Sequence, residues 1–212
     1  MDILSYFSGI FNRKTNYWKN IDLKLLFCYN QNENGDAIMK KLFTLDSKNY
    51  DKNIEIRNRP SARGIIIRDG KVAMVHSKMY DYYKFPGGGI EQDESPVNAM
   101  IREVQEESGL VVIPDSIVEF GNVHRRSRTE NGGLFIQDNF YFICSCEEKI
   151  SKTNLDIYES DEGFILEFVE PYIAITKNRN CPYEKKMPLM LEREARVLEL
   201  LMEQGYFGTC NA

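Results

Sequence analysis

The segment GGGIEQDESPVNAMIREVQEESGL spans residues 87–110 and places a glycine run directly before a strongly acidic helix. Ser95 and Pro96 supply an N-cap residue and a proline suited to the first helical position, so a helix is expected to begin at Pro96. Gly109 is expected to end it as a C-terminal cap. Apolar residues recur at helical spacing and predict a face packed against the core, namely Val97, Met100, Ile101 and Val104.

Three carboxylates, Glu103, Glu106 and Glu107, crowd one face of this predicted helix. Like charges three or four residues apart repel by roughly 0.2–0.5 kcal/mol per pair. A divalent cation would remove that repulsion, since Mg²⁺ binds a few carboxylates together with waters and substrate phosphates. The alternative is a solvated acidic face. The glycine run 87–89 favours the metal site, because backbone without side chains can approach phosphates or offer a carbonyl to a metal.

The stretch from Gly88 to Leu110 resembles the signature of the Nudix hydrolase family, G-x5-E-x7-R-E-U-x-E-E-x-G-U, in which U is apolar. Every defined position matches: Gly88, Glu94, Arg102, Glu103, Val104, Glu106, Glu107, Gly109 and Leu110. At average usages of about 7% per residue type, seven fixed letters match by chance in roughly one window per 10⁸. The strands around the motif fit the family's layout across residues 60–205, and residues 1–55 lie outside it.

The resemblance implies an α/β fold, an α/β/α sandwich around a mixed β-sheet. It also implies cleavage of a diphosphate linkage in a nucleoside diphosphate derivative. Glu103, Glu106 and Glu107 would hold Mg²⁺ or Mn²⁺, joined by the Gly88 carbonyl. Arg102 would orient a carboxylate, and its spacing makes a helical pair with Glu106 available. These three glutamates and Arg102 are the predicted catalytic set, with Glu94 as a supporting charge.

The general base stays open at this point. Relatives use either a glutamate of the motif or a glutamate on a later loop. Glu159, Asp161 and Glu162 in YESDEGF could supply it, and the alternative is a solvated acidic turn.

Three basic residues are predicted to bind substrate: Arg63, Lys84 and Arg126. Arg126 belongs to HRRSR (residues 124–128), a dense basic stretch expected to end a strand and enter a loop. It would clamp phosphates or balance the acidic site as a solvated strand end, and His124 is interpreted as structural. Relatives that cleave ADP-ribose or dinucleoside polyphosphates carry a downstream Pro or Tyr marker, where this chain has Arg126 and Ser127. The substrate therefore stays open.

Turn signals and periodicity place the remaining elements. Asp69-Gly70 predicts a hairpin within RGIIIRDGKVAMVHS, and a short helix is expected to begin at Pro171. Further strands are expected at IVEFGNVH, LFIQDNFYFICSC and GFILEFVEP. A final helix is expected in LMLEREARVLELLMEQG, with Leu191, Ala195, Leu198 and Met202 along one side. We expect two regions, an N-terminal extension over 1–58 and a Nudix domain over 59–212.

Composition limits the partners of this 212-residue chain. Its net charge of -5 argues against broad nucleic-acid binding. No run approaches the roughly 20 apolar residues that span a bilayer, and MDILSYFSGIFNRK reads as a short amphipathic helix, with a membrane-surface anchor as the alternative. Five cysteines without zinc-type C-x2-C spacing indicate reduced thiols and a cytoplasmic location. A further hypothesis is that the native chain begins at Met39 and that residues 1–38 are an extension.

These observations favour a metal-dependent pyrophosphohydrolase acting on a nucleoside triphosphate or a nucleotide conjugate. An RNA 5′-end pyrophosphohydrolase, with HRRSR on the RNA backbone, is an alternative. A non-catalytic nucleotide sensor is another, as is an allylic-diphosphate isomerase, which would need a catalytic cysteine. Many relatives dimerise, so the resemblance also allows a homodimer.

Overall fold

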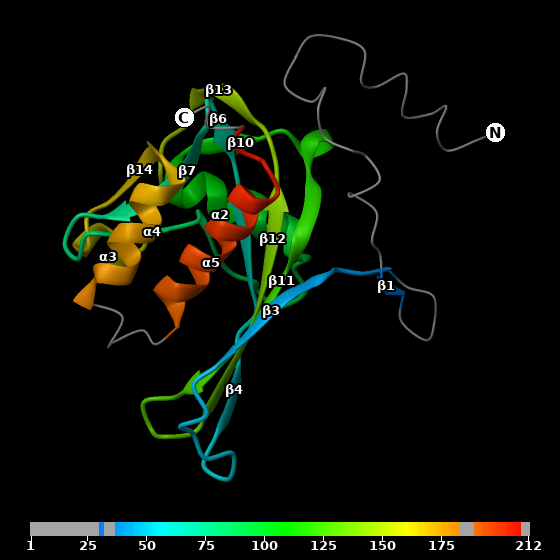
Figure 1. Ribbon diagram of the computed structural model, residues 1–212, viewed down its shortest axis with the longest axis vertical. Coiled ribbons are helices and arrows are strands. Elements are labelled where there is room, and N and C mark those ends of the chain that lie inside the picture. Colours follow the sequence, from blue (N-terminus) through cyan, green and yellow to red (C-terminus); the bar gives the residue numbers. More distant parts are fainter. Residues whose placement is uncertain (1–29, 32–36, 183–188, 209–212) are drawn as a thin grey trace. The chain divides into compact units, whose positions relative to one another are not determined.

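The computed structural model of the chain describes residues 30–31, 37–182 and 189–208 (Figure 1). The chain divides into two compact units, Met1–Ile38 and Met39–Ala212. In the first unit, β1 (Asn30–Gln31) pairs with β2 (Ala37–Ile38) in antiparallel fashion. The amphipathic helix expected at the start of the chain lies outside the described residues.

The main sheet of the second unit is mixed. Its strands run in the order β3-β11-β12-β5-β9, and β4 also pairs with β12. The β11–β12 pair is antiparallel, whereas β3 joins β11 and β5 joins β12 in parallel. The strands of this sheet are β3 (Lys41–Asp46), β4 (Ile56–Asn58), β5 (Ser61–Ile65), β9 (Gly87–Gly89), β11 (Val118–Arg128) and β12 (Leu134–Ile143).

Two smaller sheets complete the strand structure of the described residues. The first has the order β14-β7-β6, with β8 also paired to β7, and the second pairs β10 with β13. Their bounds are β6 (Ile67–Arg68), β7 (Lys71–Ser77), β8 (Tyr82–Lys84), β10 (Leu110–Val112), β13 (Cys146–Ile150) and β14 (Phe164–Val169). The described helices are α2 (Pro96–Ser108), η3 (Pro114–Ser116), α3 (Ile157–Asp161), α4 (Pro171–Asn180) and α5 (Met190–Glu203).

Helices cover both faces of the main sheet because neighbouring residues of β12 point to opposite sides. Tyr141 and Ile143 pack in one apolar cluster with Val197, Leu198 and Leu201 of α5. Phe142 of β12 packs in a second cluster with Ala99, Met100 and Val104 of α2. The predicted α/β/α sandwich around a mixed sheet is therefore confirmed.

The local signals at the ends of α2 are confirmed. The Ser95 Oγ accepts a hydrogen bond from the Asn98 N–H at 3.2 Å, and Pro96 occupies the first turn. Gly109 adopts a left-handed conformation with φ 72° and donates its N–H to the Gln105 carbonyl. The Asp69-Gly70 hairpin between β6 and β7 is present, with both residues at positive φ. The helix expected from Pro171 is α4.

Two expectations about element ends are wrong. The HRRSR stretch ends a strand as expected, because Arg128 is the last residue of β11, but it does not enter a loop, since all five residues lie within β11 and Arg128 pairs with Leu134. The flanking strands β3 and β4 extend the hydrogen bonding along this hairpin. At the far end of α5, Met202 is 43% exposed while Leu201 is buried, since Val197, Leu198 and Leu201 set the packed face.

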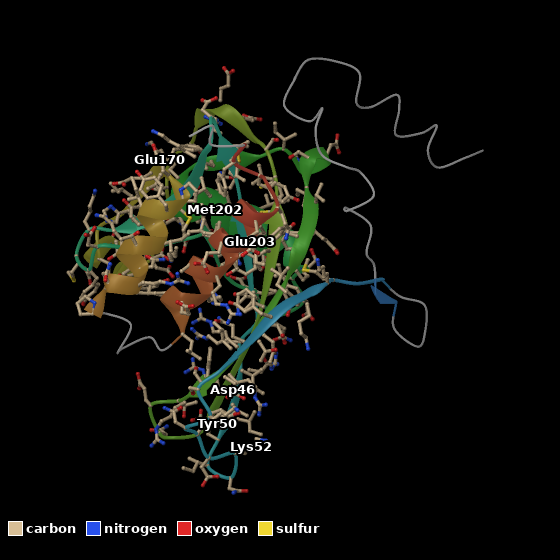
Figure 2. All side chains as sticks on the ribbon, viewed as in Figure 1. Asp46, Tyr50, Lys52, Glu170, Met202 and Glu203 are labelled. Atoms are coloured by element: carbon tan, nitrogen blue, oxygen red, sulfur yellow. The ribbon has the colours of Figure 1, made fainter. Side chains whose placement is uncertain are left out.

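Residues before the family-like region also contribute to the main sheet. The strand β3 lies at the edge of the sheet beside β11, and β4 pairs with the far end of β12. Asp46 and Tyr50, which are labelled in Figure 2, both contact Arg126 on β11. A division of the chain at residue 58 stays a prediction. None of the helices in the described ranges has the length and apolar composition needed to span a membrane.

Candidate functional site

The glycine strand β9 pairs with β5, and the acidic helix α2 packs against both strands. Gly88 is paired with Ala62 on β5, and its missing side chain leaves room for a carboxylate from α2. A Cβ at Gly88 would lie 2.3 Å from Oε2 of Glu103. Gly87 has φ 140°, and a Cβ there would lie 2.3 Å from the Ala62 carbonyl oxygen. A side chain at Gly88 would therefore displace the Glu103 carboxylate, whereas a side chain at Gly87 would meet backbone.

A single guanidinium, that of Arg102, gathers three carboxylates of the predicted site. Its Nε and Nη2 donate to the two oxygens of Glu94, each at 2.9 Å. Its Nη1 donates to Glu103 Oε1 at 2.9 Å and to Glu106 Oε2 at 3.0 Å. Nη2 also donates to the Gly89 carbonyl at 3.1 Å, which joins the helix to the glycine strand. The predicted Arg102–Glu106 helical pair is thus present.

The electrostatics of these carboxylates follow from the shared guanidinium and from burial. Hydrogen bonds from Arg102 hold the pKa of Glu94 below its usual value. Burial raises the pKa of Glu103, although Arg102 acts in the opposite direction. The hydrogen bonds that Arg102 donates to Glu94 and the other carboxylates raise the pKa of its guanidinium, so Arg102 stays charged.

The third carboxylate of the motif, Glu107, is buried beside Gly87 of the glycine strand, with 2% of its surface exposed. Its Oε1 accepts from Lys84 Nζ at 2.7 Å, and its Oε2 accepts from the Gly87 N–H at 2.9 Å. Burial raises the pKa of Glu107 to about 7, even though the charge of Lys84 lowers it. The nearby carboxylate of Glu159 adds to the upward shift.

Glu159 on the short helix α3 also reaches this pocket and is only 4% exposed. Tyr158 Oη donates to its Oε1 at 2.8 Å, and the Asp156 N–H donates to its Oε2 at 2.9 Å. Lys84 Nζ lies 3.7 Å from Glu159 Oε1. Burial acts to raise the pKa of Glu159, but hydrogen bonding to Glu107 and the charge of Lys84 bring it below the usual value.

The donor set suits a hard divalent cation, since carboxylate and carbonyl oxygens are what Mg²⁺ and Mn²⁺ prefer. The missing side chain at Gly88 lets the Glu103 carboxylate lie close to the backbone of the glycine strand, which also suits metal binding. Arg102 and Lys84 form ion pairs with the carboxylates. Among the described residues, no three Asp, Glu, His or Cys side chains are arranged so that they could hold a metal ion together. A metal would therefore have to draw carboxylate oxygens away from these two cations.

The residues predicted to bind substrate lie in different surroundings. Arg63 is 7% exposed, and its Nη1 donates to the carbonyls of Phe85 and Gly87 at 3.0 and 2.9 Å. Lys84 is engaged with Glu107. The structure thus brings Arg63 and Lys84 to the glycine strand.

Arg126 lies elsewhere on the main sheet. Its Nη1 is 3.6 Å from Asp46 Oδ2, and its guanidinium carbon lies 5.4 Å from the centre of the Tyr50 ring. His124 Nδ1 lies 2.8 Å from Asp138 Oδ1, which agrees with a structural role for this histidine. Arg126 thus contacts β3 and the loop that follows it, and His124 contacts β12.

Sequence reasoning left Glu159 undecided and did not single out Arg193 or Glu194. The solvated acidic turn is the wrong reading for Glu159, whose Asp156-x-x-Glu159 capping box turns it inward. Glu162, another candidate base, accepts from Tyr82 Oη and Ser77 Oγ. Arg193 and Glu194 place charges within the apolar pattern of α5, and this feature of the sequence could have pointed to the two residues.

The raised pKa of Glu107 predicts a pH-dependent contribution to stability in metal-free protein. Its ordinary pKa of 4.5 rises to about 7 in the folded state, so the folded state binds the proton more tightly. The contribution is complete below pH 4.5 and is lost as the pH rises to 7, on the order of 1–3 kcal/mol. We expect the unfolding free energy of wild type minus that of Glu107→Gln to decrease over this interval.

Urea denaturation in EDTA at pH 5 and pH 7.5 measures that difference. Glu130→Gln, which removes the charge of an exposed glutamate, is the matched control and should give a difference that does not vary in the same way. A wild-type-minus-Glu107→Gln difference that is constant across the interval would contradict the prediction.

Comparisons with known proteins identify a family match. The family model described as NUDIX domain matches residues 58–178. An RNA pyrophosphohydrolase of Stenotrophomonas maltophilia (strain K279a) is 41% identical over 93 residues, covering 43% of this chain and 44% of that protein. An RNA pyrophosphohydrolase of Xylella fastidiosa (strain 9a5c) is 46% identical over 55 residues, covering 25% and 28%. The chain thus spans less than half the length of these curated relatives.

Two solved structures are also similar. A NUDIX hydrolase from Nitrosomonas europaea has a TM-score of 0.48 and 20% identity, covering 66% of this chain and 90% of that one. A MutT protein from Bacillus halodurans has a TM-score of 0.45 and 19% identity, covering 56% and 72%.

Proposed function

Because this chain belongs to the NUDIX domain family, whose model matches more than half of it, we propose that it is a metal-dependent pyrophosphohydrolase. It would cleave a diphosphate linkage in a nucleoside diphosphate derivative, either a nucleoside triphosphate or a nucleotide conjugate. The observation that carries the proposal is the cluster formed by Glu94, Glu103 and Glu106 around Arg102, beside the glycine strand.

In this proposal Glu103, Glu106 and Glu107, with the Gly88 carbonyl, would hold Mg²⁺ or Mn²⁺. A bound divalent cation supplies charge neutralisation for the phosphates and acidifies a bound water. Arg102 holds its three carboxylates at the edge of the glycine strand, so their side-chain entropy is already reduced before substrate arrives.

The chain's own residues also suggest how protons are handled. Glu159 is our candidate general base, because its carboxylate lies beside Lys84, which also binds Glu107, whereas the contacts of Glu162 are with Ser77 and Tyr82. Tyr158 and the Asp156 N–H fix the Glu159 carboxylate in position. A general base must be held within hydrogen-bond reach of the group that it deprotonates, and these contacts hold the Glu159 carboxylate in one position.

A second substrate class is the 5′-triphosphorylated end of RNA. The relatives named RNA pyrophosphohydrolase support it. An exposed arginine, Arg59, also lies against the glycine strand: a Cβ at Gly89 would be 3.2 Å from its Nε. The net charge of -5 argues for a compact nucleotide as the first choice.

We also make proposals about the domain boundaries, the cellular location and the oligomeric state. We propose that residues 59–212 form the Nudix domain and that residues 1–58 extend it, supported by a family match beginning at residue 58. Cys144, Cys146 and Cys181 are free thiols, which supports a reducing cytoplasmic location. A homodimer is a further proposal, resting on family resemblance alone.

The test is product release from a panel of nucleoside triphosphates, nucleotide sugars and a 5′-triphosphorylated RNA oligonucleotide, with and without Mg²⁺. We expect metal-dependent turnover by wild type and loss of that turnover in Glu107→Gln. Nucleotide binding without turnover would instead support a sensor. Preference for the RNA over the free nucleotides would select the second substrate class.

A further inference from the structure

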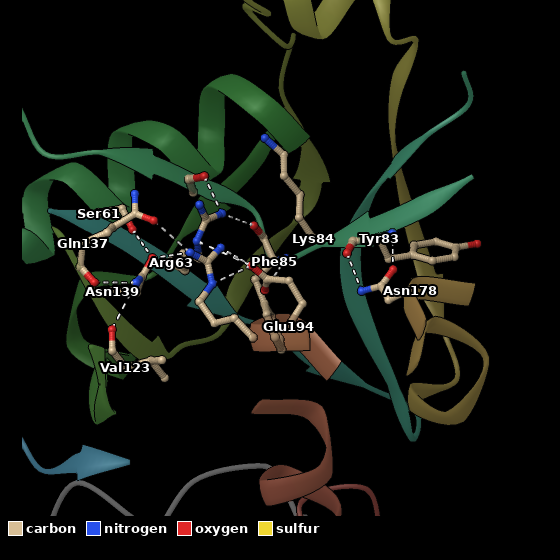
Figure 3. A network of polar contacts seen from close by, with 12 residues as sticks. Ser61, Arg63, Tyr83, Lys84, Phe85, Val123, Gln137, Asn139, Asn178 and Glu194 are labelled. Carbon is tan, nitrogen blue, oxygen red and sulfur yellow. Dashed lines mark hydrogen bonds and ion pairs between the residues drawn. The ribbon is translucent and has the colours of Figure 1, made fainter. Parts of the chain in front are cut away.

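A buried ionic network connects α5 with the glycine strand, and its α5 residues lie beyond the family match, which ends at residue 178 (Figure 3). Arg193 and Glu194 are 1% and 0% exposed although both are charged. Arg193 donates to Glu194 Oε1, to Gln137 Oε1 at 3.1 Å and to Asn139 Oδ1. Burying such charges is costly unless each is paired and hydrogen-bonded, which is the case here.

The same network holds the backbone that leads into the glycine strand. Glu194 Oε2 accepts the Phe85 N–H at 3.3 Å, and Glu194 Oε1 lies 3.8 Å from Arg63 Nε. Arg63 Nη1 in turn donates to the carbonyls of Phe85 and Gly87, at 3.0 and 2.9 Å. Three polar backbone atoms of Phe85 and Gly87 are therefore fixed by two side chains from other elements.

These contacts affect the candidate site because the neighbouring backbone, at Gly87 and Gly88, lies against the carboxylates of Glu107 and Glu103. The Gly87 N–H donates to Glu107, and Gly88 faces the carboxylate of Glu103. A shift of the Phe85–Gly87 peptides would move both groups together. Residues behind metal ligands that fix ligand geometry typically change metal affinity or activity by about 10–100-fold when substituted.

We propose that Glu194 and Arg193 on α5 are positioning residues for the glycine strand: Glu194 acts directly on the Phe85 N–H and through Arg63, and Arg193 holds the Glu194 carboxylate. They touch no reacting atom; they set where Gly87 and Gly88 lie relative to Glu107 and Glu103. The inference rests on the proposed function for its catalytic readout, and on the structure alone for its effect on the strand.

The test compares Glu194→Gln with Glu199→Gln in the full chain. Glu199 lies on the same helix, and its exposed pair with Arg179 is remote from the glycine strand, so its substitution removes the same charge without touching the network. We measure amide hydrogen exchange at Phe85 and Gly87, the Mn²⁺ concentration that half-saturates the protein, and kcat and KM separately. All measurements are made well below each variant's unfolding temperature.

We expect Glu194→Gln to exchange Phe85 and Gly87 amides about tenfold faster or more, and to raise the half-saturating Mn²⁺ concentration about 10-fold. It should lower kcat by a similar factor while KM changes much less, and Glu199→Gln should resemble wild type in every readout. A folded Glu194→Gln that loses thermal stability but keeps wild-type exchange and Mn²⁺ affinity would show a merely structural role and overturn the inference.

Two further arms keep the test decisive. If Glu194→Gln does not fold, Arg63→Lys takes its place, because one ammonium cannot occupy the positions of both Nη1, which binds the two carbonyls, and Nε, which lies 3.8 Å from Glu194. A folded Arg63→Lys with wild-type exchange at Phe85 and Gly87 would overturn the inference. If wild type shows no turnover, the proposed function fails, whereas the exchange measurement still decides whether α5 positions the strand.

Discussion

Replacement of Glu106 by Gln is expected to lower kcat about 100-fold or more at saturating Mg²⁺, the scale of a lost charge interaction in a preorganised site. The amide of Gln still offers a carbonyl oxygen to Arg102 Nη1, which Glu106 binds at 3.0 Å. The fold around α2 should therefore persist while one negative charge is removed. Steady-state kinetics with the best substrate from the panel measures the effect.

Glu91→Gln is the matched control, because Glu91 is an exposed carboxylate in the loop before the same helix. It should leave kcat within a factor of about two, as expected for a surface substitution away from the site. Near-wild-type turnover by a folded Glu106→Gln would exclude a metal-binding role for Glu106.

Gly88→Ala is expected to reduce activity about 100-fold with little loss of stability, because the added methyl meets the proposed metal-binding carboxylate of Glu103 and not the backbone. The new Cβ would lie 2.3 Å from Glu103 Oε2 and 2.7 Å from Oε1. Glu103 can move its carboxylate aside by changing rotamers at modest cost, of order 0.5–1.5 kcal/mol. Its contact with Arg102 and its place beside Gly88 would then be lost, at a cost to kcat comparable to that of a misplaced catalytic group.

Gly87→Ala provides the contrast one residue earlier. Gly87 has φ 140°, and its added Cβ would lie 2.3 Å from the Ala62 carbonyl oxygen and 2.7 Å from Arg63 Cα. Backbone cannot move aside as a side chain can, so the unfolding free energy should fall by several kcal/mol. Thermal unfolding and kcat measured on both variants test the pair. Equal loss of stability in the two would show that Glu103 is not free to move away from Gly88.

Elements with strong local signals were predictable from sequence. Ser95, Pro96 and Gly109 determine where α2 begins and ends through interactions within a few residues, and Asp69-Gly70 forms its hairpin for the same reason. The acidic face of α2 was predictable too, since helical spacing alone brings Glu103 and Glu106 to one guanidinium.

Features that depend on contacts between distant residues were not predictable. The hydrogen bond between Phe85 and Glu194 joins residues 109 positions apart, and no local pattern announces it. Glu159 reaches Lys84 only because α3 folds against β14 and β8, so its segment read equally well as a solvated turn. The strand β3 pairs with a partner about 80 residues later, and its short apolar run carried too little periodicity to place it.

The way Arg102 and Lys84 hold the carboxylates has a consequence for how the protein is stored and switched on. Each acidic side chain already carries an internal counterion, so the polypeptide should reach its native state in a chelator and survive metal starvation intact. Binding of the proposed divalent metal ion would then replace a contact with Arg102 or Lys84 by a contact with the metal. Free divalent ion levels would therefore set how many copies work at a given moment, leaving the number of folded copies unchanged.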